Sequence, residues 1–416
     1  MTATDTRPET TAPATSGGLT YQAPQTIRQM LFATWALLDS LDPALRAQAI
    51  SPDMEDPRRV DWDFIPKPDR AGVPLSKLVG HQRTLAQTLI KTGLSMRGYS
   101  QVLSVMATEN LLREMEVVER RFGVLAGDFR DPDGYWLSFF GRPAFEDTWG
   151  WRIAGHHLSL SFTVVAQRFL TITPFAMGAM PIPAGVLDPL GLNGRMAFDL
   201  LGSLSEDARA AAHVHDVAPA DFVTRQVPRV GAEEWSDNVD LGIPGYIISD
   251  EDRRKLAFVQ AAPSGLRGSD MTGDQLTAAR ELLLRYVETG PDELTAQYRR
   301  DVLAGDPSKL VFAWAGGLAP DTAHYYRVST EHLLLEADNA VAAGQHVHTV
   351  WRDLANDLGG DLLVDHYARH DHGGAHLQRR LVSNRPTEDS PLVTDSWYAP
   401  EPYAVKPNPV TLARGQ

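Results

Sequence analysis

The stretch HHLSLSFTV, residues 156–164, decides the fold because apolar and polar side chains alternate along it with a period of two. On a β-strand, Leu158, Leu160 and Phe162 would lie on one face, and His157 would share the other face with the serines. A turn signal, DPDG at residues 131–134, comes earlier in the chain. Residues 135–140 and 148–153 are therefore expected as two further strands of one antiparallel sheet.

A second group of short β segments is expected near the C-terminal end of the chain, at residues 310–315, 324–329, 332–338 and 345–350. The turns between them are too short to cross over to a parallel partner, so they form an antiparallel meander. Residues 174–191, rich in Pro and Gly, are expected as a loop. Because helices alone separate the two β groups, both groups are expected in one sheet system.

Periodicity and caps predict helices before the sheet and between its two halves. They are expected at residues 27–42 and 76–91, after Ser95, and at residues 194–204, 251–261, 273–289, 292–304 and 362–369. The predicted fold class is α+β: an antiparallel sheet meander with an N-terminal helical region and a helical insertion between the two β segments.

Three parts of the chain differ in composition. Residues 1–20 are rich in Thr, Ala and Pro without an apolar core, and we expect a disordered leader rather than a signal peptide. Residues 21–384 are expected as a single α+β domain. Residues 385–416 are rich in Pro and predict an extended C-terminal arm that lies over the body or over a partner subunit, as in a homo-oligomer.

Composition excludes several classes of function. The 416 residues carry a formal charge of −14, which argues against nucleic acid or an anionic membrane as the partner. The chain has no cysteine, so disulfides, thiolate metal sites and cysteine nucleophiles are excluded. No apolar run approaches the roughly 18 residues of a membrane span. These features predict a cytoplasmic protein with a small-molecule ligand or substrate.

Long motifs carry a family resemblance. They are YWLSFFG (135–141), WGWR (149–152), GHHLSLSFT (155–163), FAWAGG (312–317), HYYRV (324–328) and HVHTVWRD (346–353). From about residue 26 to residue 370 the sequence resembles an uncharacterised bacterial family catalogued as domain of unknown function 3500. The resemblance implies no accepted activity, substrate or cofactor. His213 and His215 depart from the usual pattern of that family, which weakens any role for them.

Four residues on the last two predicted strands suggest a metal site. His346 and His348 are two apart, so both imidazoles project from one face of their strand. Glu336 and Asp338 are likewise two apart on the preceding strand, and a hairpin would bring them across from the histidines. Imidazole with carboxylate suits Zn²⁺, Fe²⁺ or Mn²⁺ in a chain without thiolates.

His157 or His156 would complete this ligand set. His157 is preferred because it shares a face with Ser159 and Ser161 rather than with the leucines. The same histidines equally fit a polar network in the core or a substrate-binding cluster, and both interpretations stay open.

Arg152 and Arg352 each follow a tryptophan and are candidate catalytic residues, with Asp338 as the base. In a concave site an arginine binds a carboxylate or a phosphate with two parallel hydrogen bonds. The alternative is an internal ion pair that anchors a strand end. Glu109 is either a buried acid or a solvated helix residue, and the histidine-rich segment from His366 onward is not taken as an active site.

Three functions are compatible with these candidate residues. The first is a metal-dependent enzyme, a hydrolase or an oxidoreductase, that acts on a small polar or anionic molecule. The second is a metal-free protein that binds a small ligand in a cleft lined by aromatic residues and histidines. The third is a structural protein. The usual nucleotide, zincin and α/β-hydrolase motifs are missing from the sequence.

Overall fold

The structure is a computed structural model. It describes residues 21–67, 69–119, 130–145, 147–181, 187–219, 221–224, 226–231, 250–341 and 344–369. The predicted leader, residues 1–20, and the predicted arm, residues 385–416, lie outside the described residues. No helix among those described is both long enough and apolar enough to cross a bilayer.

The described residues form a mixture of helices and strands. The α-helices are α1 (Pro24–Ser40), α2 (Pro43–Ala49), α3 (Gly80–Thr92), α4 (Met96–Glu119), α6 (Gly191–Ser203), α7 (Glu206–Ala212), α8 (Asp250–Leu256), α9 (Gly273–Val287), α10 (Asp292–Ala304) and α11 (Gly360–Arg369). The longer strands are β3 (Tyr135–Gly141), β4 (Trp149–Gly155), β5 (Leu158–Val165), β7 (Phe175–Ala179), β10 (Val311–Gly316), β11 (His324–Ser329), β12 (Leu333–Val341) and β13 (His346–Asp353). The short strands are β1 (Ile50–Ser51), β2 (Val73–Pro74), β6 (Phe169–Thr171), β8 (His213–His215) and β9 (Leu266–Arg267).

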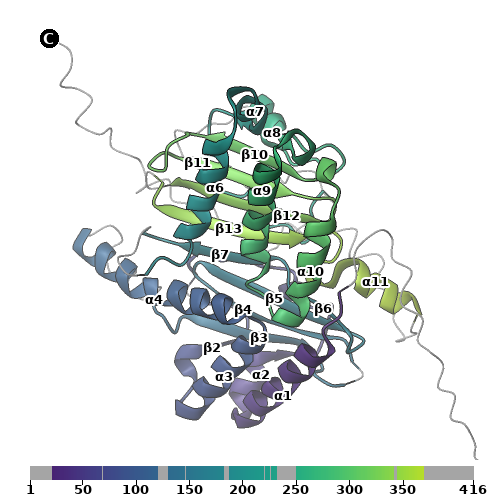
Figure 1. Cartoon of the computed structure of the whole chain (residues 1–416). Coiled ribbons are helices and arrows are strands. Elements are labelled where there is room, and N and C mark those ends of the chain that lie inside the picture. The colour runs from purple at the N-terminus through teal and green to yellow at the C-terminus, as the bar shows by residue number, and fades with distance from the viewer. Residues whose placement is uncertain are drawn as a thin grey trace, which may run out of the picture.

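All of these strands belong to one 13-stranded sheet, whose main order is β1-β3-β4-β5-β7-β13-β12-β11-β10-β8. Only the pairings of β1 with β3 and of β8 with β10 are parallel. The sheet is thus mostly antiparallel, with helices before it and between its strands (Figure 1). The predicted α+β fold is confirmed, including the meander formed by β10 to β13.

Two expectations were wrong in detail. The expected loop at 174–191 begins instead with β7, which pairs with β5 on one side and with β13 on the other. This strand joins the two halves of the sheet. The strand expected from residue 156 begins at Leu158, because His156 and His157 form the two-residue turn between β4 and β5.

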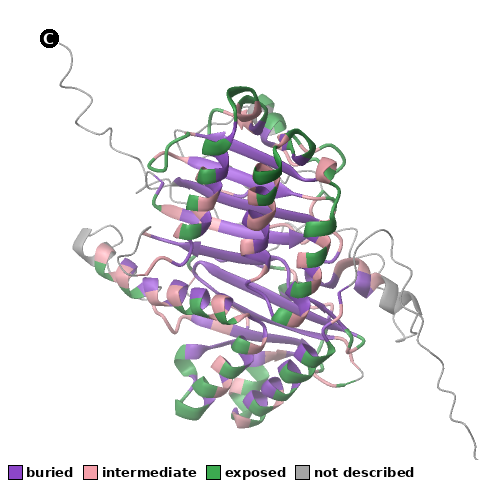
Figure 2. Cartoon of the chain, viewed as in Figure 1, coloured by how far each residue is buried: buried purple, intermediate pink, exposed green. Residues whose placement is uncertain are grey.

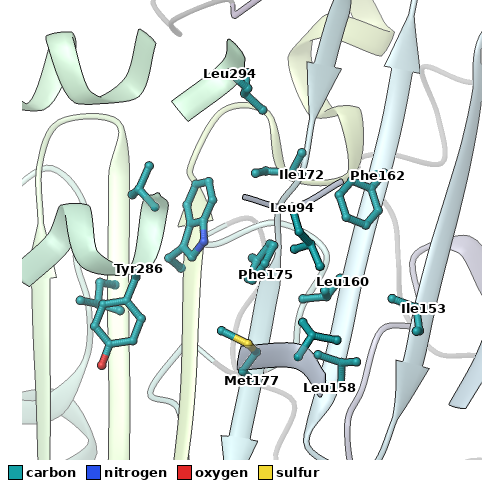
Figure 3. Close-up of a cluster of buried hydrophobic side chains, with 14 of the residues drawn as sticks. Leu94, Ile153, Leu158, Leu160, Phe162, Ile172, Phe175, Met177, Tyr286 and Leu294 are labelled. Carbon is teal, nitrogen blue, oxygen red and sulfur yellow. The ribbon is translucent and has the colours of Figure 1, made fainter. Parts of the chain in front are cut away.

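One face of the sheet packs on the helices. Helices α6, α9 and α10 lie side by side across the upper half of this face, and α4 crosses it lower down (Figure 1). The strands beneath them are buried, whereas the outer sides of the helices are exposed (Figure 2). The core between them includes Phe162 of β5, Tyr286 of α9 and Leu94 (Figure 3). Burial of these apolar side chains is the main stabilising contribution to the fold.

The opposite face of the sheet is buried as well, but it carries many polar side chains. Segments without long secondary structure cover it, and they contribute Trp62, Phe64, Phe222 and Leu358 to a second apolar cluster. This explains why the polar residues of the HHLSLSFTV stretch are not exposed: Ser159 is 0% and Ser161 is 5% exposed.

Charged residues on the covered face hold these segments in place. Arg152 of β4 donates hydrogen bonds to the backbone carbonyls of Arg58 and Asp61. Arg327 of β11 donates to the carbonyl of Leu256 and to Ser264. Since an unpaired buried charge is costly, each arginine fixes one covering segment against the sheet.

Candidate metal centre

The β12–β13 hairpin places His346 and His348 on the covered face. Asn339 stabilises the turn, because its side chain accepts a hydrogen bond from the His346 backbone N–H at 3.0 Å and donates to the Gly344 carbonyl at 2.7 Å. The pairing register shifts between Asp338 and Val341, which bulges β12 next to the histidines. Such bulges re-aim side chains, and here the two imidazole rings lie 4.5 Å apart.

The turn between β4 and β5 supplies the third imidazole. His157 has φ +60°, in the left-handed region where residues other than glycine are uncommon. Its backbone N–H donates to the Phe64 carbonyl at 2.9 Å, and its carbonyl accepts from Gly178 at 2.8 Å. The surrounding backbone therefore maintains a conformation that an ordinary side chain disfavours. An unfavourable backbone conformation that the surrounding structure maintains suggests that the side chain at this position has a function.

Three imidazole nitrogens converge on one point. Nε2 of His346 lies 2.8 Å from Nε2 of His157 and 3.0 Å from Nε2 of His348. A neutral imidazole nitrogen either donates one proton or accepts with one lone pair. Nε2 of His346 consequently cannot form two good hydrogen bonds with the other two rings. Three lone pairs directed at a shared cation satisfy all three nitrogens.

The spacing and environment of the three nitrogens fit a metal ion. Nitrogen ligands roughly 2.0–2.1 Å from a tetrahedral zinc ion lie about 3.3 Å apart, so a small outward shift would admit the ion. Burial, followed by the neighbouring histidines, lowers the pKa of His157 well below its usual value. Burial and His348 do the same to the pKa of His346. Both imidazoles are thus neutral at pH 7, which is the form that binds metals.

Two carboxylates, those of Asp338 and Asp221, lie next to His348. Asp338 is the cross-strand partner of His348 in the sheet, as the sequence predicted, and its side chain is fully buried. Asp221, on a covering segment, places Oδ1 3.4 Å from Nδ1 of His348. Phe64 and Phe222 cover the same ring, with centroids 4.8 and 6.2 Å from it. In metal sites, a histidine ligand is commonly oriented by a carboxylate near its second ring nitrogen and by the apolar side chains around it.

The remaining predicted ligand, Glu336, does not join the three histidines. It lies opposite Val350 rather than opposite a histidine. One of its oxygens accepts hydrogen bonds from the Val223 N–H and the Tyr325 hydroxyl, both at 2.8 Å, and the other accepts from the Thr224 hydroxyl. Its carboxylate therefore anchors the covering segment that carries Asp221.

The predicted catalytic arginines also serve as anchors. Arg152 is bonded to backbone carbonyls as described above, and Arg352 is bonded to Asp357 and to the Val227 carbonyl. Arg352 forms the internal ion pair of the alternative interpretation with Asp357, whereas Arg152 is bonded to backbone carbonyls rather than to a carboxylate. The structure therefore does not bring Arg152 or Arg352 together with the three histidines.

The imidazole of His156 stacks on that of His157, with ring centroids 3.6 Å apart, but its nitrogens have other partners. Its Nδ1 lies 2.5 Å from Oε1 of Glu109 and 2.8 Å from the guanidinium of Arg130. Glu109 is 1% exposed, so of its two sequence interpretations the buried acid is the one observed. Of the two adjacent histidines, His157 is the one whose Nε2 lies near His346, and His156 is bonded to Glu109 and Arg130 in an adjoining buried ion-pair cluster.

Several residues of the site were not found by sequence reasoning. Asp221, Phe64 and Phe222 lie in irregular segments, where no periodicity indicates which side chains point inward. Gly178 was assigned to a loop, although a Cβ there would lie 2.8 Å from Cδ2 of His157 and 3.0 Å from Cδ2 of His348. The only available signal for Gly178 was a glycine between apolar residues, which marks close approach of other groups.

Replacing Gly178 with alanine is expected to disturb the three histidines. The added methyl group would force both imidazoles to move, so we expect a 10- to 100-fold loss of metal affinity, roughly the effect of disturbing a supporting group. Overpacking should also lower the free energy of unfolding by about 1–3 kcal/mol. Zinc titration and chemical denaturation of purified protein measure the two effects.

The matched control is Gly202→Ala in α6, where a Cβ meets no atom within 4 Å. The same substitution there should leave zinc affinity unchanged and stabilise the helix by roughly 0.5–1 kcal/mol. Equal zinc affinity in Gly178→Ala and in the parent protein would contradict the packing described here.

The comparisons with known proteins agree with the motifs of the sequence. The model of the family described as "Protein of unknown function (DUF3500)" matches residues 23–360, which is most of the chain and contains all three histidines. No curated protein and no solved structure gives a significant match. The chain belongs to the DUF3500 family.

Proposed function

We propose that this protein is a metal-dependent enzyme that acts on a small polar or anionic molecule. His157, His346 and His348 are the proposed ligands of a divalent ion, Zn²⁺, Fe²⁺ or Mn²⁺. The observation that carries the proposal is the convergence of three Nε2 atoms, with separations of 2.8 and 3.0 Å, from one buried and two partly buried imidazoles. Nε2 of His346 cannot form good hydrogen bonds with both of the other rings at once.

A ligand set of three histidines favours catalysis over a structural role. Structural zinc sites are usually closed by four protein ligands, whereas catalytic sites keep one position for water or substrate. His346 and His348 are partly exposed, whereas His157 is fully buried. The open position is therefore expected on the side of the two β13 histidines. An ion there would activate water for hydrolysis or bind dioxygen for an oxidation.

The surroundings favour a small substrate. The rings of Phe64 and Phe222 lie close to His348, and both side chains are almost fully buried. They leave an apolar wall beside the proposed ion, which excludes water and strengthens electrostatic interactions within the site. We therefore propose a compact polar or anionic substrate that binds directly to the ion, rather than an extended polymer.

Metal analysis of the tag-free full-length chain tests the proposal. We expect stoichiometric zinc, iron or manganese in the parent protein and its loss in the His346→Ala/His348→Ala double variant. His213→Ala/His215→Ala is the matched control, because these histidines form the same His-x-His pattern on the edge strand β8. The control should retain all of the metal.

The parent and both variants are then compared in hydrolase and oxidase assays with panels of small carboxylates and phosphate esters. Activity in the parent and the control, but not in the double variant, is the expected result. Equal substoichiometric metal in all three proteins would overturn the proposal and favour the metal-free ligand-binding protein instead. Circular dichroism establishes that the double variant is folded.

A further inference from the structure

We propose that Asp221, Asp338 and His348 form a second cation subsite, so that the centre holds two metal ions that share His348. This inference rests on the proposed function, because His348 is also one of the three ligands of the first ion. It adds two carboxylates that the first site does not use.

The geometry of these three residues fits a shared ion. One potential ligand atom from each residue lies within 4.8 Å of the other two. Oδ1 of Asp221 and Nδ1 of His348 are 3.4 Å apart, which is longer than a good hydrogen bond but close to the separation of about 3.3 Å between two ligands of one zinc ion. The two ring nitrogens of His348 thus face two different ligand groups.

Asp338 provides an independent observation. Its side chain is 0% exposed, and Oδ1 accepts a hydrogen bond from the Ala340 backbone at 3.1 Å. The other oxygen, Oδ2, is buried and has no hydrogen-bond partner within the described part of the chain. A buried carboxylate oxygen without a hydrogen-bond partner is costly, so a ligand that binds this oxygen is expected.

Charge points to a cation as that partner. The side chains of Asp338 and Asp221 bring two carboxylates to the same ring of His348, so a positive charge between them is expected. Among the described residues, no Lys or Arg forms an ion pair with either carboxylate. The neighbouring cluster of Glu109, His156 and His157 differs, because Arg130 already supplies its positive charge.

The ligand types indicate which cation would bind. Two carboxylate oxygens and one imidazole nitrogen suit a divalent ion such as Zn²⁺ or Mn²⁺. If Nδ1 bound this ion while Nε2 held the first, His348 would give up its remaining ring proton to solvent and would serve as a ligand of both ions. Asp221 is partly exposed and gives this ion a route from solvent.

The number of zinc ions per chain tests the inference. Full-length, tag-free protein is stripped with chelator, loaded with excess zinc chloride, desalted and measured by mass spectrometry. We expect about two ions in the parent, about one in Asp338→Asn, about one in His346→Ala, and almost none in His348→Ala. Asp216→Asn is the matched control, because its side chain is 95% exposed, and it should keep both ions.

One site, two sites and no site each predict a different number of zinc ions in the parent and the variants. One ion in the parent, retained in Asp338→Asn and lost in His346→Ala, would support the first site and overturn the second. No ion in the parent would overturn both proposals. Asp221→Asn, at a partly exposed position, replaces Asp338→Asn if the buried substitution prevents folding, and it should also reduce the count to one. Retention of two ions in Asp221→Asn would contradict the subsite.

Discussion

Replacing Arg352 with methionine is expected to lower the free energy of unfolding by about 3–5 kcal/mol, the usual cost of removing one partner of a buried ion pair. Arg352 is 0% exposed, and its Nε donates to Oδ2 of Asp357 at 2.5 Å. Its Nη2 donates to the Val227 carbonyl at 2.6 Å, and the guanidinium lies 5.4 Å from the ring of Trp62. Methionine fills much of the volume but leaves Asp357 buried without its cation.

Two further variants separate charge from packing. Adding Asp357→Asn to Arg352→Met removes the uncompensated charge and should recover a substantial part of the lost free energy of unfolding. Arg195→Met, at an ion pair with Asp188 whose arginine side chain is 63% exposed, should change stability by less than about 1 kcal/mol. Urea denaturation gives all four values, and similar effects of Arg352→Met and Arg195→Met would contradict the anchoring role.

The fold was easier to predict from the sequence than the site, because most signals for the strands are local in sequence. Alternation in β5 and the short turns between β10 and β13 specify an antiparallel sheet, since both signals are local in sequence. β7 was missed because it follows directly after Pro174 and contains Gly178, two residue types that usually mark loops. Its strand conformation depends on pairing with β5 and β13, which is information from distant parts of the chain.

In the candidate site, the residues on strands could be predicted from the sequence, whereas those on the covering segment could not. The period of two placed His346 and His348 on one face of a strand and Asp338 across from His348, because strand geometry determines these relations. It also predicted Glu336 as a ligand, but that carboxylate is bonded to the covering segment instead. Asp221 and Phe222 come from that segment, whose path is set by contacts with Glu336 rather than by any local pattern. Sequence periodicity therefore indicated the strand half of the site and missed the covering half.

Zinc is expected to stabilise the parent protein strongly and His157→Asn much less. An ion that binds only the folded chain adds about 2.7 kcal/mol to the free energy of unfolding at a free concentration 100 times Kd. Removing one of three ligands should weaken zinc binding by roughly 100- to 1000-fold, from about 3–4 kcal/mol per ligand. At the same zinc concentration, most of the stabilisation disappears.

Asparagine is the informative replacement because it tolerates the left-handed backbone conformation that His157 adopts at φ +60°. His157→Asn should therefore remain folded without metal, whereas the β-branched His157→Val should be destabilised at the backbone as well. Urea denaturation with and without zinc chloride separates these two effects, and His215→Asn, on the edge strand β8, serves as the histidine control. If His157→Asn gained as much stability from zinc as the parent, the ion would bind elsewhere. A zinc response that falls sharply when His157 is replaced would show that the positive-φ turn is maintained for its imidazole.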